Sequence, residues 1–232
     1  MDIKNVLDRL DLRKFPCHFV DVRIECTQSS SFLFQNGELV AASERPVLGA
    51  FVRVHHHGAW FYSSTTAVSA LADEITKLIK QAEAGPHASG VYALPANNGA
   101  HHLINKTKHA FSNISLEDKV KMGEKYLPLI KKIDNLKDSR IRYTDVYKEK
   151  FYKSSVGTEF SYDFNQAGFA FGATLKKGEE LFEDGFRLYA TEFNSFQNLE
   201  SDILNYFVEA QKFLSAKTIT VSYTHLTLPT KA

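Results

Sequence analysis

The stretch VDVRIEC, residues 20–26, decides the fold because apolar and charged side chains alternate along it without interruption. Neighbouring side chains of an extended chain point to opposite faces, so this pattern predicts a half-buried β-strand. Phe32 and Phe34 begin a second predicted strand, and the pair Asn36-Gly37 follows it. Both central residues of a type I′ turn need positive φ angles. The pair therefore predicts a hairpin whose return strand runs through residues 39–40.

The alternation continues after this hairpin. Residues 49–54, GAFVRV, predict another strand, His57-Gly58 a turn, and residues 60–62 the strand that returns. Apolar residues at helical spacing before these strands predict a short amphipathic helix over residues 2–13.

A second amphipathic helix is predicted after the strands. Its apolar stripe runs from Val68 to Ala82, and the Ser/Thr residues at 63–66 offer N-caps for it. Gly85-Pro86 ends it, because proline cannot continue a helix. The segment 85–113 is rich in Gly, Pro and Asn, and we expect it to be a linker.

The same order of elements recurs in residues 114–217. Ser115 and Asp118 resemble a capping box at the start of a helix that Pro128 is expected to kink. Strands follow, with turns at residues 156–158 and at Lys177-Gly178, and a helical stripe from Leu199 to Leu214 closes the chain.

The sequence therefore predicts an α+β fold made of two similar helix–antiparallel strands–helix repeats. In an overlay of the two halves, the segment from Gly37-Glu38 to Gly49 corresponds to that from Thr158-Glu159 to Gly168. The predicted domains are a first α/β repeat over 1–84, the linker over 85–113, a second α/β repeat over 114–217, and a tail over 218–232.

The composition excludes several classes of protein. The net charge of +1 gives no strong field for nucleic acid or an anionic membrane, and no apolar run is long enough to cross a bilayer. Two cysteines, Cys17 and Cys26, are too few for a disulfide scaffold, so we expect reduced thiols. The N-terminal residues have no apolar segment typical of a secretory signal. A cytoplasmic protein is the expectation.

Four motifs in order resemble the opening of the TldD/PmbA metallopeptidases, also called modulators of DNA gyrase. They are residues 21–25, DVRIE; residues 36–39, NGEL; residues 49–54, GAFVRV; and residues 58–65, GAWFYSST. The chain departs from the family pattern at Phe61-Tyr62, where the family has Gly-Phe. Residues 116–120, 147–149 and 156–159 are similar to the family's central region, so the resemblance covers residues 18–217.

The resemblance implies zinc-dependent hydrolysis of peptides or unfolded proteins. It places the zinc ligands in a C-terminal domain, on a helix with the pattern His-Glu-x-x-x-His. No histidine here is followed by glutamate, so no catalytic or metal-binding residue can be carried over, and zinc is expected in a missing C-terminal domain.

The resemblance implies a homo- or heterodimer with a family member. Residues 221–232 resemble translated sequencing-adapter read-through, so we expect a non-catalytic N-terminal fragment with a non-native tail. The alternative is a stand-alone protein-binding module without enzymatic activity.

Two further groups of residues suggest a binding site. His55 and His57 share one face of a strand, but two imidazoles are too few for a closed zinc site, and a solvated hairpin tip is favoured. A metal site at His101-His102 is still less favoured. Aromatic residues interleaved with basic residues over 142–153 resemble a nucleic-acid stacking platform, yet the near-neutral charge favours an aromatic strand with a basic solvent face. No nucleic-acid or membrane partner is expected.

Overall fold

A computed structural model describes residues 3–85, 96, 98–104, 111–214 and 216 of the chain. Within them lie four α-helices and one seven-stranded sheet. The helices are α1 (Ile3–Arg9), α2 (Leu71–Glu83), α3 (Leu116–Glu124) and α4 (Glu200–Phe213). The strands are β1 (Phe19–Gln35), β2 (Glu38–His56), β3 (Ala59–Thr65), β4 (Ala100–Leu103), β5 (Leu136–Ser154), β6 (Glu159–Lys177) and β7 (Glu180–Ala190).

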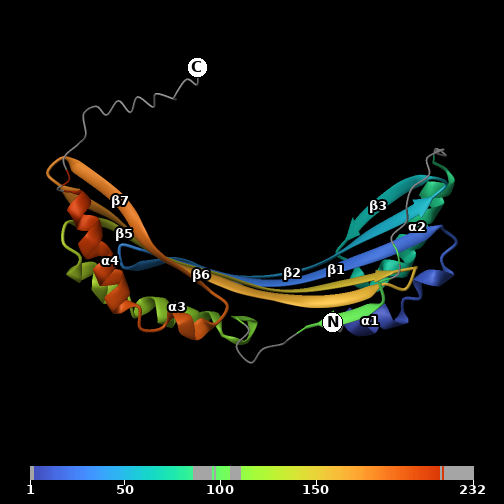
Figure 1. The fold of residues 1–232 in the computed structure, drawn as a ribbon, viewed down its shortest axis with the longest axis horizontal. Helices are drawn as coiled ribbons and strands as arrows, with labels where there is room; N and C mark the ends of the chain where they lie inside the picture. The colour runs from blue at the N-terminus through green and yellow to red at the C-terminus, as the bar shows by residue number, and fades with distance from the viewer. Residues whose placement is uncertain (1–2, 86–95, 97, 105–110, 215, 217–232) are drawn as a thin grey trace, which may run out of the picture.

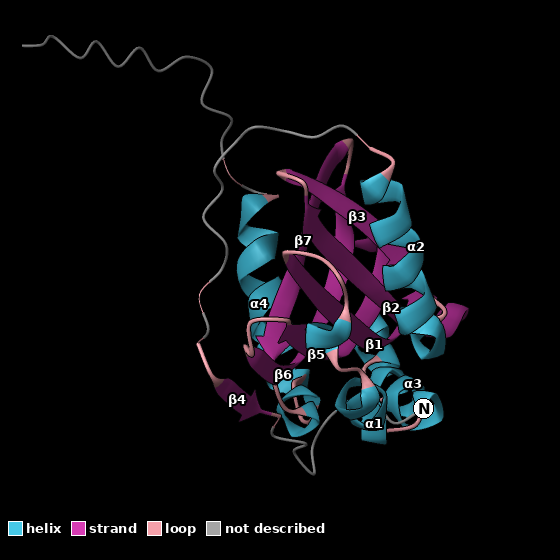
Figure 2. Cartoon of the chain, turned by 90° about the vertical axis from the view of Figure 1, so that its right-hand side faces the viewer, coloured by secondary structure: helices cyan, strands magenta, loops and turns pink. Residues whose placement is uncertain are grey.

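The sheet is continuous from one end of the chain to the other. Its strand order is β3-β2-β1-β5-β6-β4, and β7 also pairs with β6. All pairs are antiparallel except β4 with β6. Figure 1 shows that the long strands bend into a crescent, with the described helices on the convex side and, of the described elements, only strands on the concave side. Figure 2 shows α2 and α4 at the two ends of this helical layer.

The central strands are longer than the sequence pattern predicts. Residues 20–26 and the strand that begins at Phe32 belong to the single strand β1. The polar residues between them lack alternation, but β2 and β5 pair with them on both sides and supply their backbone hydrogen bonds. The predicted hairpin is confirmed, because Asn36 and Gly37 have φ angles of 52° and 91°. The turn at His57-Gly58 is also confirmed, with φ angles of 48° and 76°.

The helix caps and helix bounds predicted from the sequence agree with the structure only in part. Ser115 caps α3, and its hydroxyl accepts a hydrogen bond from the Asp118 N–H at 3.1 Å. The predicted kinked helix is two separate helices: α3 ends at Glu124, and Pro128 lies in the first turn of a 3-10 helix that spans Leu127–Lys132. The first helix is shorter than predicted. The 63–66 run provides no side-chain cap for α2, whose N-cap is Ala70.

Two apolar cores lie under the convex face, one at each end of the crescent. The first joins α1 and α2 to the outer parts of β1 and β2, with Val22 and Ile75 among its buried residues. The second joins α3 and α4 to β5 and β6. Phe32 and Phe34 of β1 pack into this second core, so the strands of the predicted first domain reach into both.

The division into domains stays a prediction. The expected linker at 85–113 contains the strand β4 and a 3-10 helix over Phe111–Asn113. Residues 3–83 and residues 116–213 each run through a helix, three successive antiparallel strands and a further helix, with β1 and β5 adjacent at the middle of the sheet. An internal sequence repeat does not follow from this order alone. The tail at 218–232 lies outside the described residues.

Two smaller findings concern the helices and the thiols. Of the helices that the structure describes, none is long and apolar enough to cross a membrane. Cys17 and Cys26 are partly buried and take part in no disulfide among the described residues. Burial raises the pKa of the Cys17 thiol to about 11.

Candidate functional site: a groove on the concave face

The register of the sheet aligns side chains into rows that run across the strands. In the middle row, Phe51 of β2 lies opposite Arg23 of β1, and Arg23 lies opposite Tyr152 of β5. Ser64 of β3 and Phe160 of β6 extend the row at its two ends. Directly opposite residues of neighbouring strands point to the same face. The row therefore places the Arg23 guanidinium between the rings of Phe51 and Tyr152 on the concave face.

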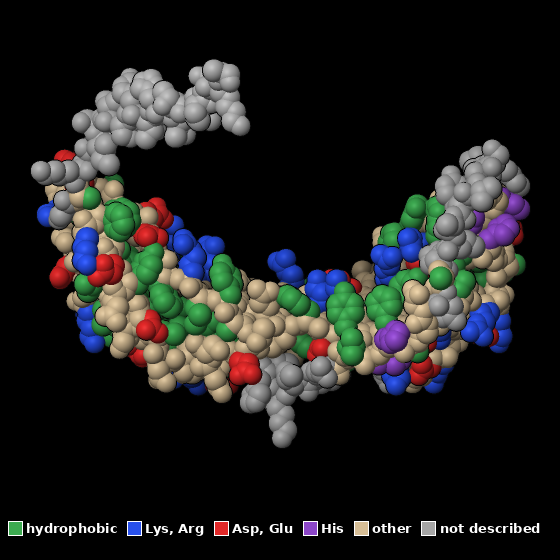
Figure 3. Space-filling view, viewed as in Figure 1, with side chains coloured by type: hydrophobic (Ala, Val, Ile, Leu, Met, Phe, Trp, Pro, Cys, Tyr) green, Lys and Arg blue, Asp and Glu red, His purple; other side chains and the backbone are tan. Residues whose placement is uncertain are grey.

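A groove with a volume of about 1060 Å³ runs over this row. Its lining comes from five neighbouring strands, from Ser64 of β3 to Phe160 of β6. Since neighbouring strands lie 4.7–4.9 Å apart, the groove spans about 19 Å across the sheet. Gly49 deepens it, because the residue has no side chain and a Cβ there would meet only the Thr65 carbonyl oxygen, at an ordinary contact distance of 3.7 Å. Figure 3 shows the concave side, with Lys and Arg side chains along it.

Aromatic rings form both walls of the groove. Phe51 stacks on Tyr62 of β3, with 5.9 Å between ring centroids, at one end. Tyr152 stacks on Phe160 at 4.7 Å at the other end, and Phe160 continues to Tyr162 at 6.3 Å. Phe51, Phe160 and Tyr162 are 36–38% exposed, so their ring faces remain available to a ligand.

Positive charge prevails on the groove floor. Glu25 accepts ion pairs from Lys148 at 2.6 Å and from Lys150 at 3.2 Å. The hydrogen bond from Lys148, followed by that from Lys150, lowers the pKa of Glu25. Arg23 lies over the Tyr152 ring at 5.7 Å and forms no ion pair with any described carboxylate. Three cations therefore face one carboxylate here.

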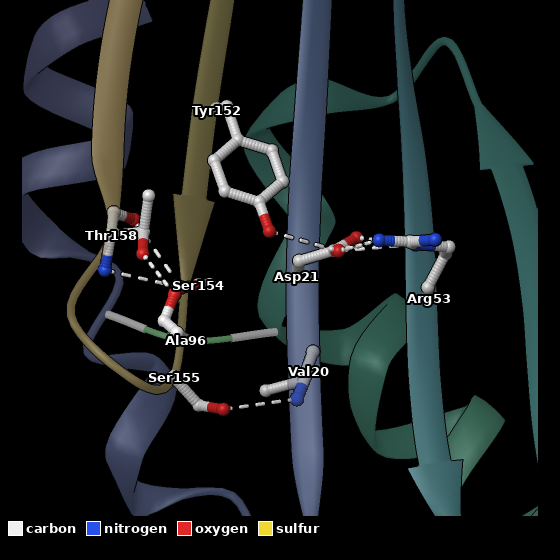
Figure 4. Close-up of polar contacts among 8 residues, drawn as sticks. All are labelled: Val20, Asp21, Arg53, Ala96, Tyr152, Ser154, Ser155 and Thr158. Atoms are coloured by element: carbon white, nitrogen blue, oxygen red, sulfur yellow. Dashed lines mark hydrogen bonds and ion pairs between the residues drawn. The ribbon is translucent and has the colours of Figure 1, made fainter. Parts of the chain in front are cut away.

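An ion-pair network fixes one side of the groove. The buried Asp21 carboxylate accepts hydrogen bonds from the Arg53 guanidinium and, at 3.1 Å, from the Tyr152 hydroxyl. The hydrogen bond to Asp21 raises the pKa of Arg53. Figure 4 shows these side chains meeting across β1, β2 and β5. Because Asp21 neutralises Arg53 and holds the Tyr152 ring, this network supports the groove wall and leaves Arg23 as the accessible guanidinium.

A second set of hydrogen bonds in Figure 4 holds the turn between β5 and β6. The Ser154 hydroxyl accepts from the Thr158 N–H at 3.2 Å, and the Ser155 hydroxyl accepts from the Val20 N–H at 3.1 Å. The Thr158 hydroxyl donates to the Ala96 carbonyl at 3.1 Å. The turn is therefore tied to β1, which places Tyr152 and Phe160 on the groove wall.

The structure separates the residues of the suggested nucleic-acid platform. Tyr143, Tyr147 and Phe151 alternate with Lys148 and Lys150 along β5, so the aromatics point to the convex face and the bases to the concave face. Tyr143 is buried in the second core, and Tyr147 is 8% exposed. Tyr152 alone of these aromatics lies on the concave face. The other aromatic members of the groove come from β2, β3 and β6, which no local pattern in the sequence joins to β5.

The histidines gather more closely than the sequence indicates. His18, at the start of β1, lies 5.4 Å from His56, 6.0 Å from His55 and 6.4 Å from His57 between ring centroids. His55 is 7% exposed, so the interpretation as a solvated tip is wrong for this residue, because Trp60 packs on its ring at 5.0 Å. Burial, followed by the charge of His18, lowers the pKa of His55.

The zinc that the resemblance implies finds no fitting ligand set here. Among the described residues, no three His, Cys, Asp or Glu side chains are arranged to hold a metal ion, and this includes the histidine group. His102 lies in β4, 2.9 Å from the Ser161 hydroxyl, and His101 contacts the Asn98 carbonyl at 2.9 Å.

A buried ion pair on the convex side was not visible in the sequence. Lys119 of α3 lies 2.8 Å from the Asp145 carboxylate of β5, and the two side chains are 2% and 3% exposed. The Ser30 hydroxyl donates to the same carboxylate at 2.6 Å and accepts from Lys119 at 2.9 Å. Lys119 lies beside Val120 in the middle of α3, and nothing in the local sequence pattern indicates that its side chain is buried. Each of the three polar groups has its hydrogen-bond or ion-pair partner within this cluster. We infer that the cluster has a structural role, which is to hold α3 on the sheet.

Comparison with known proteins shows what this chain is similar to. Residues 20–85 match the family described as PmbA/TldA metallopeptidase domain 1. These residues carry β1, β2, β3 and α2, so the resemblance stated from the sequence is confirmed over this region. No curated protein matches the sequence.

Solved structures extend the likeness to most of the chain. A proposed modulator of a DNA gyrase from Thermotoga maritima superposes with a TM-score of 0.70 at 15% identity, over 87% of this chain and 46% of that one. TldE from Thermococcus kodakarensis gives 0.68 at 12% identity, over 88% and 46%. A proposed modulator of DNA gyrase from Bacteroides thetaiotaomicron gives 0.65 at 14% identity, over 89% and 48%. The fold is therefore shared, and this chain spans about half the length of these proteins.

Proposed function

We propose that the chain is the non-catalytic N-terminal part of a zinc-dependent TldD/PmbA-type peptidase that acts on peptides or unfolded proteins. The observation that carries this proposal is the pattern of coverage: nearly all of the chain superposes on less than half of each solved relative. The zinc and its ligands would belong to a C-terminal domain. The role of this chain would be scaffolding, dimer contact with a family member and access of the substrate, in the cytoplasm.

The concave groove supports the substrate-access role. It is open, it is lined by aromatic rings, and its walls are fixed by hydrogen bonds and ion pairs within this chain. Binding sites of this kind need a shaped apolar surface with a few placed polar groups. We further propose that the two halves of the chain are an internal repeat, which their matching element order favours.

Extension of the chain tests the proposal. The genomic sequence beyond Ala216 would be determined, and the encoded longer protein would be compared with the 232-residue chain. We expect the longer protein to hold zinc after dialysis and to cleave unstructured peptides in a chelator-sensitive manner, whereas the shorter chain does neither. Chelator-sensitive cleavage by the shorter chain, or a longer protein without zinc and without cleavage, would contradict the proposal.

A stand-alone protein-binding module is the second candidate. The observation that favours it is that the groove is built entirely from residues of this chain. A gene that ends near residue 217, with no peptidase domain after it, would select this function. The genomic sequence therefore separates the two candidates before any activity is measured.

A further inference from the structure

We propose that the concave groove binds an extended peptide that presents one acidic side chain between two aromatic or large apolar ones. This inference depends on the proposed substrate-access role for one point only, namely that the ligand is a peptide. It adds a specificity to that role, which is assigned to Arg23 and the rings beside it.

The geometry of the middle row sets the order of side chains in the ligand. Phe51, Arg23, Tyr152 and Phe160 come from four consecutive strands, so the distance from Phe51 to Phe160 is about 14 Å. An extended peptide places every second side chain on the same face, about 6.6 Å apart. Three facing side chains therefore cover the row, with the central one over Arg23 and the outer ones over the aromatic walls.

The charges select an acid for the central position. Arg23 is exposed and has the Tyr152 ring as its neighbour, which orients the guanidinium without neutralising it. Lys150, in the adjacent row, lies 5.9 Å from the Tyr162 ring centroid and shares Glu25 with Lys148. A guanidinium binds a carboxylate through two parallel N–H···O bonds, so Asp or Glu fits this point.

The same features favour a peptide over a nucleic acid. A single strand of nucleic acid brings a phosphate for every base, and Glu25 stands in the groove floor where phosphates would pass. The aromatic rings also stack on one another, from Phe51 to Tyr62 and from Tyr152 to Phe160. Bases would have to separate these pairs in order to insert, whereas side chains can pack on the exposed ring faces.

The experiment measures binding of labelled peptides to the 232-residue chain by fluorescence anisotropy. The probe is Phe-Ser-Glu-Ser-Phe with blocked ends, compared with matched peptides that carry Gln or Lys in the centre. We expect the Gln peptide to bind about fivefold more weakly and the Lys peptide more than about tenfold more weakly, with the difference shrinking at high salt. An oligothymidine serves as the nucleic-acid probe.

Two variants and one control locate the site. Arg23→Glu should abolish the preference for the acidic peptide, and Gly49→Leu should weaken all three peptides by filling the groove. Arg142→Glu is the matched control, because Arg142 is exposed on the same face of β5, eight residues from Lys150 or about 26 Å along the strand. It should change binding less than about twofold. Thermal melts establish that each variant is folded, and the two groove variants test the proposal independently of each other.

Equal binding of the three peptides, an effect of Arg142→Glu equal to that of Arg23→Glu, or tighter binding of oligothymidine than of the acidic peptide would overturn the proposal. Failure of the peptidase proposal is recognised separately. If the extended protein cleaves peptides while the groove shows no acidic preference, this inference alone is lost. If the groove binds the acidic peptide and the extended protein is inactive, the peptidase proposal alone is lost.

Discussion

The two faces of the sheet use the same strands for opposite purposes. On the convex face, Phe32 of β1 and Tyr143 of β5 stack at 5.3 Å and are at most 1% exposed under the helices. On the concave face, Arg23 of β1 and Phe160 of β6 remain open to solvent. An antiparallel sheet needs only one covered face to form its core. The exposed aromatic residues of the concave face bury less surface than those of the convex core, so we expect them to contribute less to stability and to be available to a ligand.

The sharpest test of the convex side is Lys119→Met. This change leaves the Asp145 carboxylate buried without its cation, and we expect a loss of about 3–5 kcal/mol in the free energy of unfolding. The measurement is urea denaturation followed by circular dichroism.

Lys121→Met, on the same helix, is the control for that measurement. Lys121 pairs with Glu117 at 2.6 Å in a fully solvated position, so its loss should leave stability nearly unchanged. Comparable losses for the two variants would mean that the Lys119–Asp145 contact does not hold α3 on the sheet.

The sequence carried enough information for the hairpins but not for the groove. Asn36-Gly37 and His57-Gly58 are local signals, since a positive φ angle depends on the residues themselves. The joining of β1 into one strand depends on β5, which lies more than a hundred residues away in the sequence, so local alternation could not reveal it. For the same reason, the row from Phe51 to Phe160 was not predictable. The ion pair at Lys119 also arises from tertiary contact alone.

A second test concerns the tight turn that sets the register of both faces. Gly37→Val places a β-branched residue at a φ angle of 91°, and we expect a loss of about 1–3 kcal/mol. Gly49→Val in β2, the strand that follows this turn, is the control, because a Cβ there meets only ordinary contact at 3.7 Å and the residue needs no positive φ. Thermal or urea unfolding measures both. A neutral Gly37→Val would contradict the account of how this hairpin fixes the register.

A third test, with a smaller expected effect, measures how stability depends on pH through His55, near the end of β2. The pKa of His55 lies below its ordinary value of 6.5 in the folded chain, so folding favours the neutral ring. Its contribution to stability is therefore complete above pH 6.5 and declines as the pH falls below that value. We expect the melting temperature of the native chain to fall more steeply on acidification than that of His55→Phe. Parallel slopes for the two proteins would show that His55 does not titrate with folding.

The most direct measurement of the central claim compares Phe32→Ala with Phe51→Ala in both unfolding and peptide binding. Phe32 is 1% exposed in the convex core, and its truncation should cost about 3–5 kcal/mol. Phe51 is 36% exposed on the concave face, and its truncation should cost less than about 1 kcal/mol while weakening the acidic peptide severalfold. If Phe51→Ala lowers stability as much as Phe32→Ala, or leaves peptide binding unchanged, the concave face is not the ligand-binding face of this sheet.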